Sequence, residues 1–330
     1  MQNAKGLSLM SGGLDSQLAV KVLQRAGAYV EGVCFATPFF SADAARKAAA
    51  ALGVTLHVID FTDDEIALIE NPPHGFGGAM NPCIDCHATM IRRAGELMAS
   101  LGFDFVSTGE VMGQRPMSQN KQSLATVEKA SGLKGRLVRP LSALLLDPTI
   151  PEQEGRLDRS KLLDIHGRSR EPQIALAREF GIVDYPSPAG GCKLTEEGYG
   201  RKLKDLLVHE GLGNRRYVEL LSTGRRFRLP GGSGLIVGRD RNENAVLQSV
   251  DAPAILASEN CPGPTAVMTS LETESDLRLA AEIVASYSKF DRLETDVTVK
   301  IARPGAAVEK CAVERSLAAD RSRLKEWQIC

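Results

Sequence analysis

The feature that most constrains this chain is a regular alternation of apolar runs and amphipathic stretches over its first sixty residues. The apolar runs cover residues 6–10, 30–36 and 55–61, and the amphipathic stretches between them cover residues 17–25 and 42–52. Runs of this length are typical of buried strands, and the stretches have helical periodicity. Strands joined by helical crossovers pair in parallel. Two later runs, 103–108 and 136–141, extend the pattern, so we predict an α/β fold: an open parallel sheet with helices on both faces.

A chain of 330 residues is about twice the length of an average domain, which predicts a second domain. After about residue 207 the pattern changes to a helix near 215–221, an apolar strand at 234–238 and a βαβ-like tail. We therefore expect a catalytic domain over residues 1–208 and a smaller α+β domain over residues 209–330.

The sequence shows no feature of an exported or membrane protein. No run approaches the roughly 18 apolar residues that a spanning helix needs, and the N-terminus has no signal-like stretch. Seven cysteines in a chain of this length are too few and too scattered for a disulfide framework. We expect a cytoplasmic protein with reduced thiols.

The first strand is followed by the segment MSGGLDS, residues 10–16, which opens the first helix. Backbone N–H groups and the helix dipole favour a phosphate at this position, and the glycines allow close approach of the backbone. The candidate phosphate-binding residues are Ser11, Gly12, Gly13, Asp15 and Ser16. The Asp15 carboxylate is suited to hold Mg²⁺ or to order the loop. No lysine follows as in the Walker loop, so the segment is not a GxxxxGK[ST] motif.

The motif SGGxDS after an N-terminal strand resembles the pyrophosphate loop of the PP-loop ATP pyrophosphatases. That family includes tRNA thiolation enzymes, GMP synthetase, asparagine synthetase and tRNA lysidine synthetase. The resemblance implies an adenine nucleotide alpha-hydrolase-like fold, ATP as cofactor and release of pyrophosphate.

A second segment, STGEVMGQRPMSQN at 107–120, is followed by LVRPL at 137–141. Both resemble the tRNA 4-thiouridine synthases, in which a GExxGQxxSQ segment precedes an LRPL strand end, and the related 2-thiouridine synthases. The likeness covers about residues 5–195. Those synthases carry RNA-binding domains before the catalytic domain, so here we expect a C-terminal or separate RNA-binding domain. The resemblance implies that the following residues line the nucleotide and base pocket or lie near the phosphates: Gly109, Glu110, Gln114, Ser118, Gln119 and Arg139.

Three cysteines are candidates for the sulfur chemistry. Cys83 and Cys86 form a CxxC at the start of an amphipathic stretch, and a helix N-terminus lowers a thiol pKa. Cys192 follows a Pro- and Gly-rich loop at 186–191. Related thiolation enzymes place a cysteine at this later position, and some pair it with an upstream CxxC to hold an iron–sulfur cluster. The resemblance thus implies a [4Fe-4S] cluster on Cys83, Cys86 and Cys192, with one iron left open for sulfide.

Two alternatives stay open at this stage. One is a persulfide and disulfide relay between Cys192 and a CxxC thiol, and the other is zinc or no metal at all. His87 is either a fourth ligand or a surface residue at the helix start.

Residues 201–241 carry ten Lys or Arg against four Asp or Glu, in a chain whose formal net charge is −1. Such clustering is typical of binding to a phosphate backbone, although a solvated basic face gives the same count. The segments FRLP at 227–230 and GLIVGR at 234–239 resemble the RNA-binding domain of NFACT ribosome-associated proteins. Because arginine forks match phosphate geometry, the predicted phosphate contacts are Arg225, Arg226, Arg228 and Arg239.

We therefore expect an ATP-dependent tRNA sulfurtransferase that adenylates a uridine carbonyl and replaces its oxygen with sulfur, in the manner of 4-thiouridine synthesis. Its expected partners are tRNA and a sulfur donor, either a cysteine desulfurase or free sulfide. Homodimerisation stays open. The alternatives are thiolation of another tRNA base to 2-thiouridine or 2-thiocytidine, activation of a small-molecule acceptor, and a non-catalytic RNA-binding accessory protein.

Overall fold

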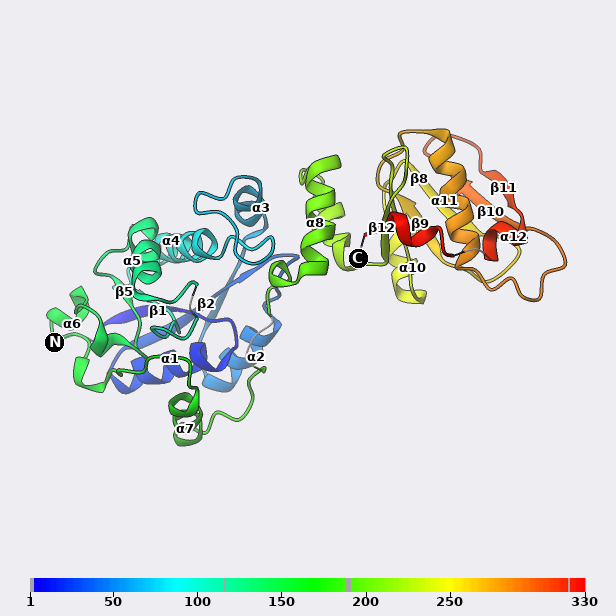
Figure 1. Ribbon diagram of the computed structural model, residues 1–330. Coiled ribbons are helices and arrows are strands. Elements are labelled where there is room, and N and C mark those ends of the chain that lie inside the picture. The colour runs from blue at the N-terminus through cyan, green and yellow to red at the C-terminus, as the bar shows by residue number, and fades with distance from the viewer. Residues whose placement is uncertain (1–2, 116, 188–190, 320, 330) are drawn as a thin grey trace. The chain divides into compact units, whose positions relative to one another are not determined.

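A computed structural model describes residues 3–115, 117–187, 191–319 and 321–329. The chain separates into two compact units, Met1–Thr195 and Glu196–Cys330 (Figure 1). Helix α8 (Glu197–His209) belongs to the second unit. The boundary between the two units therefore lies before this helix, whereas the sequence pattern predicted a boundary near residue 208.

The first unit is built on a five-stranded parallel sheet in the order β3-β2-β1-β4-β5. Its strands are β1 (Lys5–Leu9), β2 (Tyr29–Ala36), β3 (Leu56–Asp60), β4 (Phe105–Ser107) and β5 (Leu137–Val138). Its helices are α1 (Leu14–Arg25), α2 (Asp43–Leu52), α3 (Thr62–Glu70), α4 (Cys83–Leu101), α5 (Lys121–Ser131), α6 (Ile150–Gln153) and α7 (Glu171–Glu179), with 3₁₀ turns at Ala143–Leu145, Arg159–Lys161 and Lys193–Thr195. The predicted parallel sheet is confirmed.

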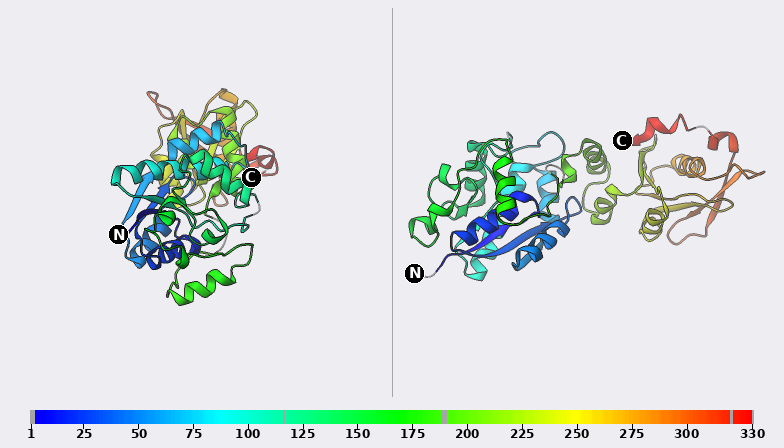
Figure 2. Two further views of the ribbon diagram at one scale, coloured as in Figure 1. Left: turned by 90° about the vertical axis from the view of Figure 1, so that its left-hand side faces the viewer. Right: turned by 90° about the horizontal axis from the view of Figure 1, so that it is seen from below.

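Helices cover both faces of this sheet (Figures 1 and 2). Buried side chains of α1, α2 and α7 form one core cluster, which includes Leu18, Ala45 and Ala177. Those of α4 and α5 form the other with side chains from the opposite face of the strands, such as Leu7 and Val33. Successive side chains of a strand point to opposite faces of the sheet, so the same apolar strands contribute residues to both cores.

The second unit contains a seven-stranded sheet in the order β11-β10-β8-β9-β7-β6-β12. Its strands are β6 (Arg225–Arg228), β7 (Gly234–Val237), β8 (Ala254–Ser258), β9 (Thr265–Met268), β10 (Val297–Ala302), β11 (Glu309–Val313) and β12 (Gln328–Ile329). After α8 its helices are α9 (Arg215–Glu219), α10 (Arg241–Gln248), α11 (Glu274–Ser286), α12 (Arg315–Ala319) and α13 (Leu324–Trp327), with a 3₁₀ turn at Leu220–Ser222. Side chains of α11 pack on the sheet as a core of their own.

All of the strand pairs described in this sheet are antiparallel. The predicted α+β class is confirmed. Strands β9 and β10 both run antiparallel to β8, which lies between them, so they are parallel to each other and are joined by α11. The segment β9-α11-β10 is therefore a split βαβ unit, as the βαβ-like tail predicted from the sequence.

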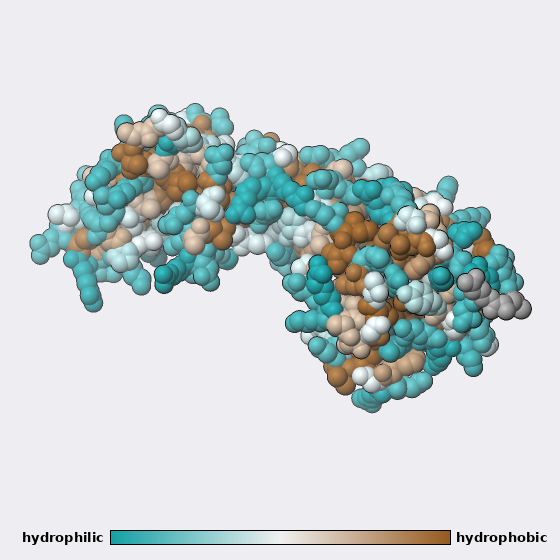
Figure 3. Space-filling view, turned by 180° about the vertical axis from the view of Figure 1, so that it is seen from behind, coloured by the Kyte–Doolittle hydropathy of each residue, from teal (hydrophilic) through white to brown (hydrophobic). Residues whose placement is uncertain are grey.

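The face of the molecule shown in Figure 3 is mainly hydrophilic, with hydrophobic residues in separate patches on both units. Within the described residues, no helix is both long enough and apolar enough to span a bilayer.

Candidate active site

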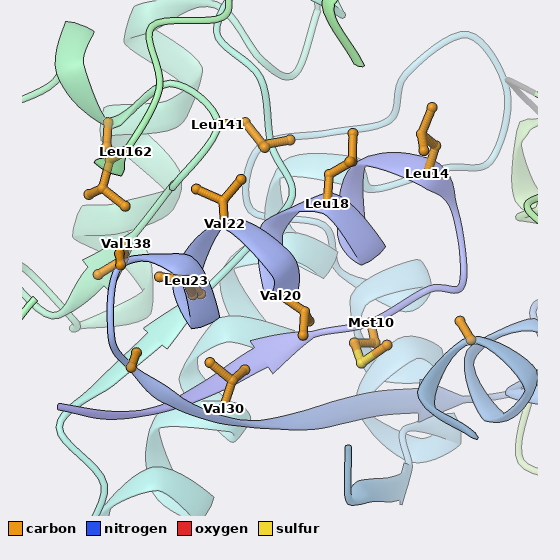
Figure 4. Close-up of a cluster of buried hydrophobic side chains, with 14 of the residues drawn as sticks. Met10, Leu14, Leu18, Val20, Val22, Leu23, Val30, Val138, Leu141 and Leu162 are labelled. Atoms are coloured by element: carbon orange, nitrogen blue, oxygen red, sulfur yellow. The ribbon is translucent and has the colours of Figure 1, made fainter. Parts of the chain in front are cut away.

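The glycine loop between β1 and α1 has the geometry of a tight backbone cradle. Gly12 has a φ of +82°, and a Cβ added there would lie 2.3 Å from the carbonyl carbon of Ala44. The Gly13 amide donates to Ser11 Oγ at 3.3 Å, and Ser16 Oγ donates to the Gly13 carbonyl at 2.8 Å. Figure 4 shows Met10 and Leu14, which flank the loop, among the core side chains. The loop is thus anchored at both ends and braced by its own serines.

Gln17, which the sequence analysis missed, ties this loop to a distant part of the chain. Its side chain is 2% exposed and donates to the carbonyls of Gly12, at 2.9 Å, and of Asp184, at 3.0 Å. The available signal was a polar residue in register with the apolar, buried positions of α1.

Asp15 is held by the second motif and by α7. Gln114 Nε2 donates to Asp15 Oδ2 at 2.9 Å, and Gln173 Nε2 in turn donates to Gln114 Oε1 at 3.0 Å. The other carboxylate oxygen, Oδ1, is buried without a hydrogen bond and lies 3.9 Å from a guanidinium nitrogen of Arg170. Asp15 and Gln114 were predicted from the sequence. Arg170 and Gln173 were not, because only folding brings the start of α7 to this loop.

Gly109 lies directly against the loop. A Cβ added to it would lie 2.6 Å from the carbonyl carbon of Asp15 and 2.7 Å from the amide nitrogen of Ser16. The end of β4 and the glycine loop are therefore in backbone contact, so the first two motifs form one site.

Glu110 and Arg139 form a buried ion pair beside this contact. Arg139 Nε donates to Glu110 Oε2 at 3.0 Å, and His87 Nδ1 lies 3.3 Å from Glu110 Oε1. Burial alone would raise the pKa of Glu110, but the hydrogen bonds and charges of His87 and Arg139 outweigh it and lower the pKa to about 2. The carboxylate is therefore ionised throughout the physiological range.

The resemblance implied that Arg139 lies near the ATP phosphates. Its side chain is instead 2% exposed, and its nitrogens donate to Glu110, to Glu128 Oε2 at 3.2 Å and to the Leu124 carbonyl at 3.0 Å. Protein acceptors therefore occupy the guanidinium, which positions Glu110, and the nearness of Arg139 to the phosphates stays a prediction.

Ser118 and Gln119 are buried in the same loop, which is described on both sides of residue 116. The backbone of Gln119 bonds to Gly113 and Arg115, at 2.7 and 2.8 Å, and its Oε1 is buried without a hydrogen bond. Both residues therefore lie in the loop that follows Gly109 and Glu110. None of the interactions described joins their side chains to Asp15 or Glu110.

The three candidate cysteines of the first unit lie near one another, and Cys86 and Cys192 also interact with a buried acid, Glu65. Cys83 and Cys86 begin α4, and Cys192 precedes the 3₁₀ turn whose Lys193 amide donates to the Phe39 carbonyl. Glu65 on α3 is 0% exposed. Part of the loop before Cys192, residues 188–190, lies outside the described residues.

The expectation of a lowered thiol pKa at the start of α4 is wrong for Cys86. Burial, with added repulsion from Glu65, raises the pKa of Cys86 well above its usual value. Burial, partly offset by backbone amides, raises the pKa of Cys192 to about 12, again with Glu65 contributing. Burial also raises the pKa of Glu65 itself to about 7. The cost of desolvation exceeds the effect of the helix dipole here.

The donor set at this site suits a cationic group. Thiols and a carboxylate meet in a buried region, where Glu65 and the Cys86 thiol lie within hydrogen-bonding reach of each other. A cation would compensate both kinds of group. Within the described residues, no three His, Cys, Asp or Glu side chains are close enough to chelate a single metal ion.

A loop held by Asp85 leads into the first of these cysteines. Asp85 is 5% exposed, and its oxygens accept from the His74 amide at 2.9 Å and lie 2.5 Å from His74 Nδ1. Asn81 Nδ2 donates to Cys83 Sγ at 3.1 Å. The sequence analysis did not identify these residues as functional, although Asp85 lies inside the CxxC.

The arginines predicted to bind RNA in the second unit are engaged by protein groups. Arg226 is 2% exposed, and its guanidinium nitrogens lie 3.7 Å from oxygens of Asp205 and Glu210. Arg228 donates to the same two carboxylates, with closest distances of 2.7 and 2.8 Å. These contacts speak against the predicted phosphate contacts of the two arginines. A count of charges in the sequence does not show that basic and acidic residues meet in a buried cluster.

The other two predicted arginines are less enclosed. The Arg225 guanidinium lies over the Tyr287 ring, 4.6 Å from its centroid. Arg239 has a side chain that is 48% exposed and pairs with Glu243, donating also to the Ser222 carbonyl at 3.1 Å. Arg239 is therefore exposed, and Arg225 is half-buried.

Comparison with known proteins assigns a family to part of each unit. Residues 1–145 match the family described as "Thiamine biosynthesis protein (ThiI)", and residues 224–328 match the "NFACT protein RNA binding domain". Both resemblances predicted from sequence are confirmed over these residues.

Individual relatives agree with these matches. A probable tRNA sulfurtransferase of Caldanaerobacter subterraneus subsp. tengcongensis is 30% identical over 148 residues, which are 42% of this chain and 37% of the relative. The tRNA-specific 2-thiouridylase MnmA of Sulfurimonas denitrificans is 34% identical over 112 residues, 30% of this chain and 32% of the relative. The chain thus spans about a third of these relatives' length. A solved 4-thiouridine synthetase in complex with RNA and ATP has 20% identity and a TM-score of 0.38, covering 66% of this chain and 52% of that one.

Proposed function

We propose that this chain, with a ThiI-family domain over its first 145 residues and an NFACT-type RNA-binding domain near its C-terminus, is an ATP-dependent tRNA sulfurtransferase. One contact carries the proposal. His87, the residue after Cys86, lies 3.3 Å from Glu110, whose neighbour Gly109 packs against the glycine loop. The helix that carries the CxxC is therefore joined to the nucleotide site, as coupled activation and sulfur transfer require.

ATP would bind with its phosphates over the backbone amides at residues 12–16, at the N-terminus of α1. The buried oxygen Oδ1 of Asp15 has no hydrogen bond, and an oxygen donor of this kind suits Mg²⁺. The hydrogen bond from Gln114 to the other oxygen would keep Oδ1 directed to the cation.

The activating step is attack by a uridine carbonyl oxygen on the α-phosphorus of ATP, with formation of an O–P bond and departure of pyrophosphate. The adenylated carbon then accepts sulfur, and AMP leaves with the former carbonyl oxygen. Preorganised amides of the glycine loop would stabilise the negative charge that develops on the phosphates. The residues proposed for the sulfur transfer are Cys83, Cys86 and Cys192.

A [4Fe-4S] cluster on these thiolates, when bound, would supply an iron that accepts sulfide. The alternative route is a persulfide and disulfide relay between Cys192 and one of the CxxC thiols, which needs no metal. The sulfur would come from a cysteine desulfurase or free sulfide. We place the reaction in the cytoplasm, where thiols stay reduced.

The 4-thiouridine reaction is the one we favour, because the ThiI match covers the glycine loop, the 107–120 segment and residues 137–141. The similarity to a 2-thiouridylase keeps another tRNA base as the second candidate. In the second unit, Arg226 and Arg228 are engaged by carboxylates, so we propose that Arg225 and Arg239 contact the phosphates of the tRNA.

The test is ATP–pyrophosphate exchange with and without unmodified tRNA, followed by mass spectrometry of the tRNA nucleosides. Exchange stimulated by tRNA and formation of 4-thiouridine would support the proposal. Exchange without RNA would indicate a small-molecule acceptor, and no exchange would indicate an RNA-binding accessory protein.

A further inference from the structure

Strand β6 directs its three arginines to two different environments. Arg226 and Arg228 meet carboxylates on one side of the strand. Because successive side chains of a strand point to opposite faces, Arg225 lies on the other face together with Phe227. The Phe227 ring lies there 6.4 Å from the ring of Tyr287, at the end of α11. Arg225 is therefore the arginine of this strand that is directed away from the acidic residues.

A second arginine reaches the same tyrosine from a distant part of the sequence. The guanidinium carbons of Arg225 and Arg321 lie 4.6 and 5.1 Å from the centroid of the Tyr287 ring. Arg321 Nε also donates to the Ser286 carbonyl at 2.8 Å. Guanidinium groups are attracted to an aromatic face, so the ring holds both side chains in place. Their outer nitrogens have no described hydrogen bond within the described residues.

The positive charge at this ring is not balanced as it is at other arginines of the unit. Arg303 pairs with two glutamates, and Arg323 lies 3.8 Å from an oxygen of Glu282. Among the described residues, no carboxylate forms an ion pair with Arg225 or Arg321. The two guanidinium carbons cannot be farther apart than their two distances to the ring together, so the charges repel each other. An anion bound to both would relieve that repulsion.

The fold fixes the position of Arg321. Its carbonyl accepts from the amide of Leu324, which is buried in the core beneath α11. Helix α12 packs on α11 before it (Figure 1), and β12 after it pairs with β6 in the register Gln328 to Phe227. The strand that carries Arg225 is thus joined directly to the segment that carries Arg321.

We propose that Arg225 and Arg321, held by the ring of Tyr287, form a binding site for the phosphate backbone of RNA. This inference rests on the proposed function for the identity of the RNA as tRNA. The planar donor forks of two arginines match the oxygens of phosphates. Tyr287 is a positioning residue: it orders two flexible side chains before RNA binds, which lowers the entropic cost of binding.

The experiment is a fluorescence anisotropy titration of unmodified tRNA with the full chain at a series of salt concentrations. The variants are Arg225→Gln and Arg321→Gln, and Arg303→Gln is the matched control, because its charge is already paired. We expect each site variant to bind about three- to tenfold more weakly, with a salt slope smaller by about one, and the control to bind as wild type. Wild-type affinity and slope in both site variants would overturn the proposal.

Two variants of the tyrosine test its positioning role. Tyr287→Phe keeps the ring and should bind tRNA as wild type does. Tyr287→Leu removes the ring and should weaken binding about as much as one arginine substitution does. Wild-type affinity in Tyr287→Leu would overturn the role of the ring.

A measurement on wild-type protein avoids any effect of substitution on folding. Phenylglyoxal modifies exposed arginines, and mass spectrometry maps the modified positions. Arg321 is exposed, so tRNA should protect it from modification, whereas Arg303 should react equally with and without tRNA. Equal modification of Arg321 in both conditions would overturn the proposal. Protection by Mg-ATP alone would show a site for free nucleotide phosphates and would overturn its assignment to RNA.

The outcomes also distinguish this inference from the proposed function. If tRNA affinity depends on Arg321 but no 4-thiouridine forms, tRNA thiolation fails and the phosphate site stands. If wild-type protein makes 4-thiouridine and the arginine variants bind tRNA as wild type does, the phosphate site fails and the proposed function stands.

Discussion

Gly12 and Gly13 are adjacent, but only Gly12 has a backbone conformation that favours glycine. Gly12 has a φ of +82° and no room for a Cβ, whereas Gly13 has a φ of −70° and a nearest neighbour, Ser11 Oγ, at 3.4 Å. A left-handed conformation costs a non-glycine residue roughly 1–2 kcal/mol before any clash is counted. We predict that Gly12→Ala lowers the melting temperature by several degrees and abolishes ATP binding in a calorimetric titration.

Gly13→Ala is the matched comparison. It should melt within about a degree of wild type, since its effect on the free energy of unfolding should stay within roughly 0.5 kcal/mol. Any loss of ATP affinity in this variant would then indicate that a phosphate of ATP lies close to the backbone of Gly13. A Gly12→Ala protein with wild-type melting and affinity would contradict the cradle geometry.

Glu110 should make the protein sensitive to acid. Its pKa falls from 4.5 to about 2 on folding, so its stabilisation is complete above pH 4.5 and is lost as the pH falls towards 2. The difference corresponds to about 3 kcal/mol for this fully buried group. We predict that Glu110→Gln is less stable than wild type by about that amount at pH 7 and that the gap narrows below pH 4.5.

The measurement is urea unfolding at a series of pH values. Glu154→Gln, at an exposed position in the same unit, is the control and should follow the wild-type curve. A constant gap between Glu110→Gln and wild type over the whole range would show that Glu110 acts through packing rather than through its charge.

At the scale of elements, the loop before α4 is held chiefly by Asp85. The two contacts to His74 close this segment on the helix that carries both CxxC cysteines. We predict that Asp85→Ala destabilises the protein by about 1–3 kcal/mol, as expected for a lost buried hydrogen bond to a charged group. It should also speed proteolytic cleavage between residues 72 and 80, as mapped by mass spectrometry.

Glu96→Ala on the same helix removes only exposed ion pairs, to Arg92 and Arg93. Such pairs contribute about 0–1 kcal/mol, so cleavage of the loop should not change. Equal cleavage rates in the Asp85 and Glu96 variants would show that the loop is held by other contacts.

The elements themselves were largely predictable from the sequence, because periods of 2 and 3.6 are local properties. The strands of the first sheet appear where apolar runs predicted them, and α4 begins at the CxxC. The contacts between elements were not predictable. Packing brings together the residues that bury Arg226, that engage Arg139 and that place an acid beside the thiols. No local sequence pattern predicts which residues of different elements come into contact.

At the scale of the whole molecule, the two units have separate cores and different proposed ligands. The cluster around α1 and the cluster around α11 share no residue, and only the first unit contains the glycine loop. A ligand stabilises the cooperative unit whose native state binds it, by about 2.7 kcal/mol at a concentration of 100 Kd. ATP should therefore stabilise the first unit selectively, and tRNA should act on the second.

We predict that calorimetry of the full chain resolves two transitions and that saturating Mg-ATP raises one of them by roughly 5–10 °C, the shift expected for about 2.7 kcal/mol in a domain of this size. The other transition should not move with ATP. It should rise with tRNA, and less so at high salt, because contacts with phosphates weaken as counterions compete. Gly12→Ala should remove the ATP shift and leave the response to tRNA. If ATP raised both transitions equally, the units would unfold as one, and the separate cores would not act as separate cooperative domains.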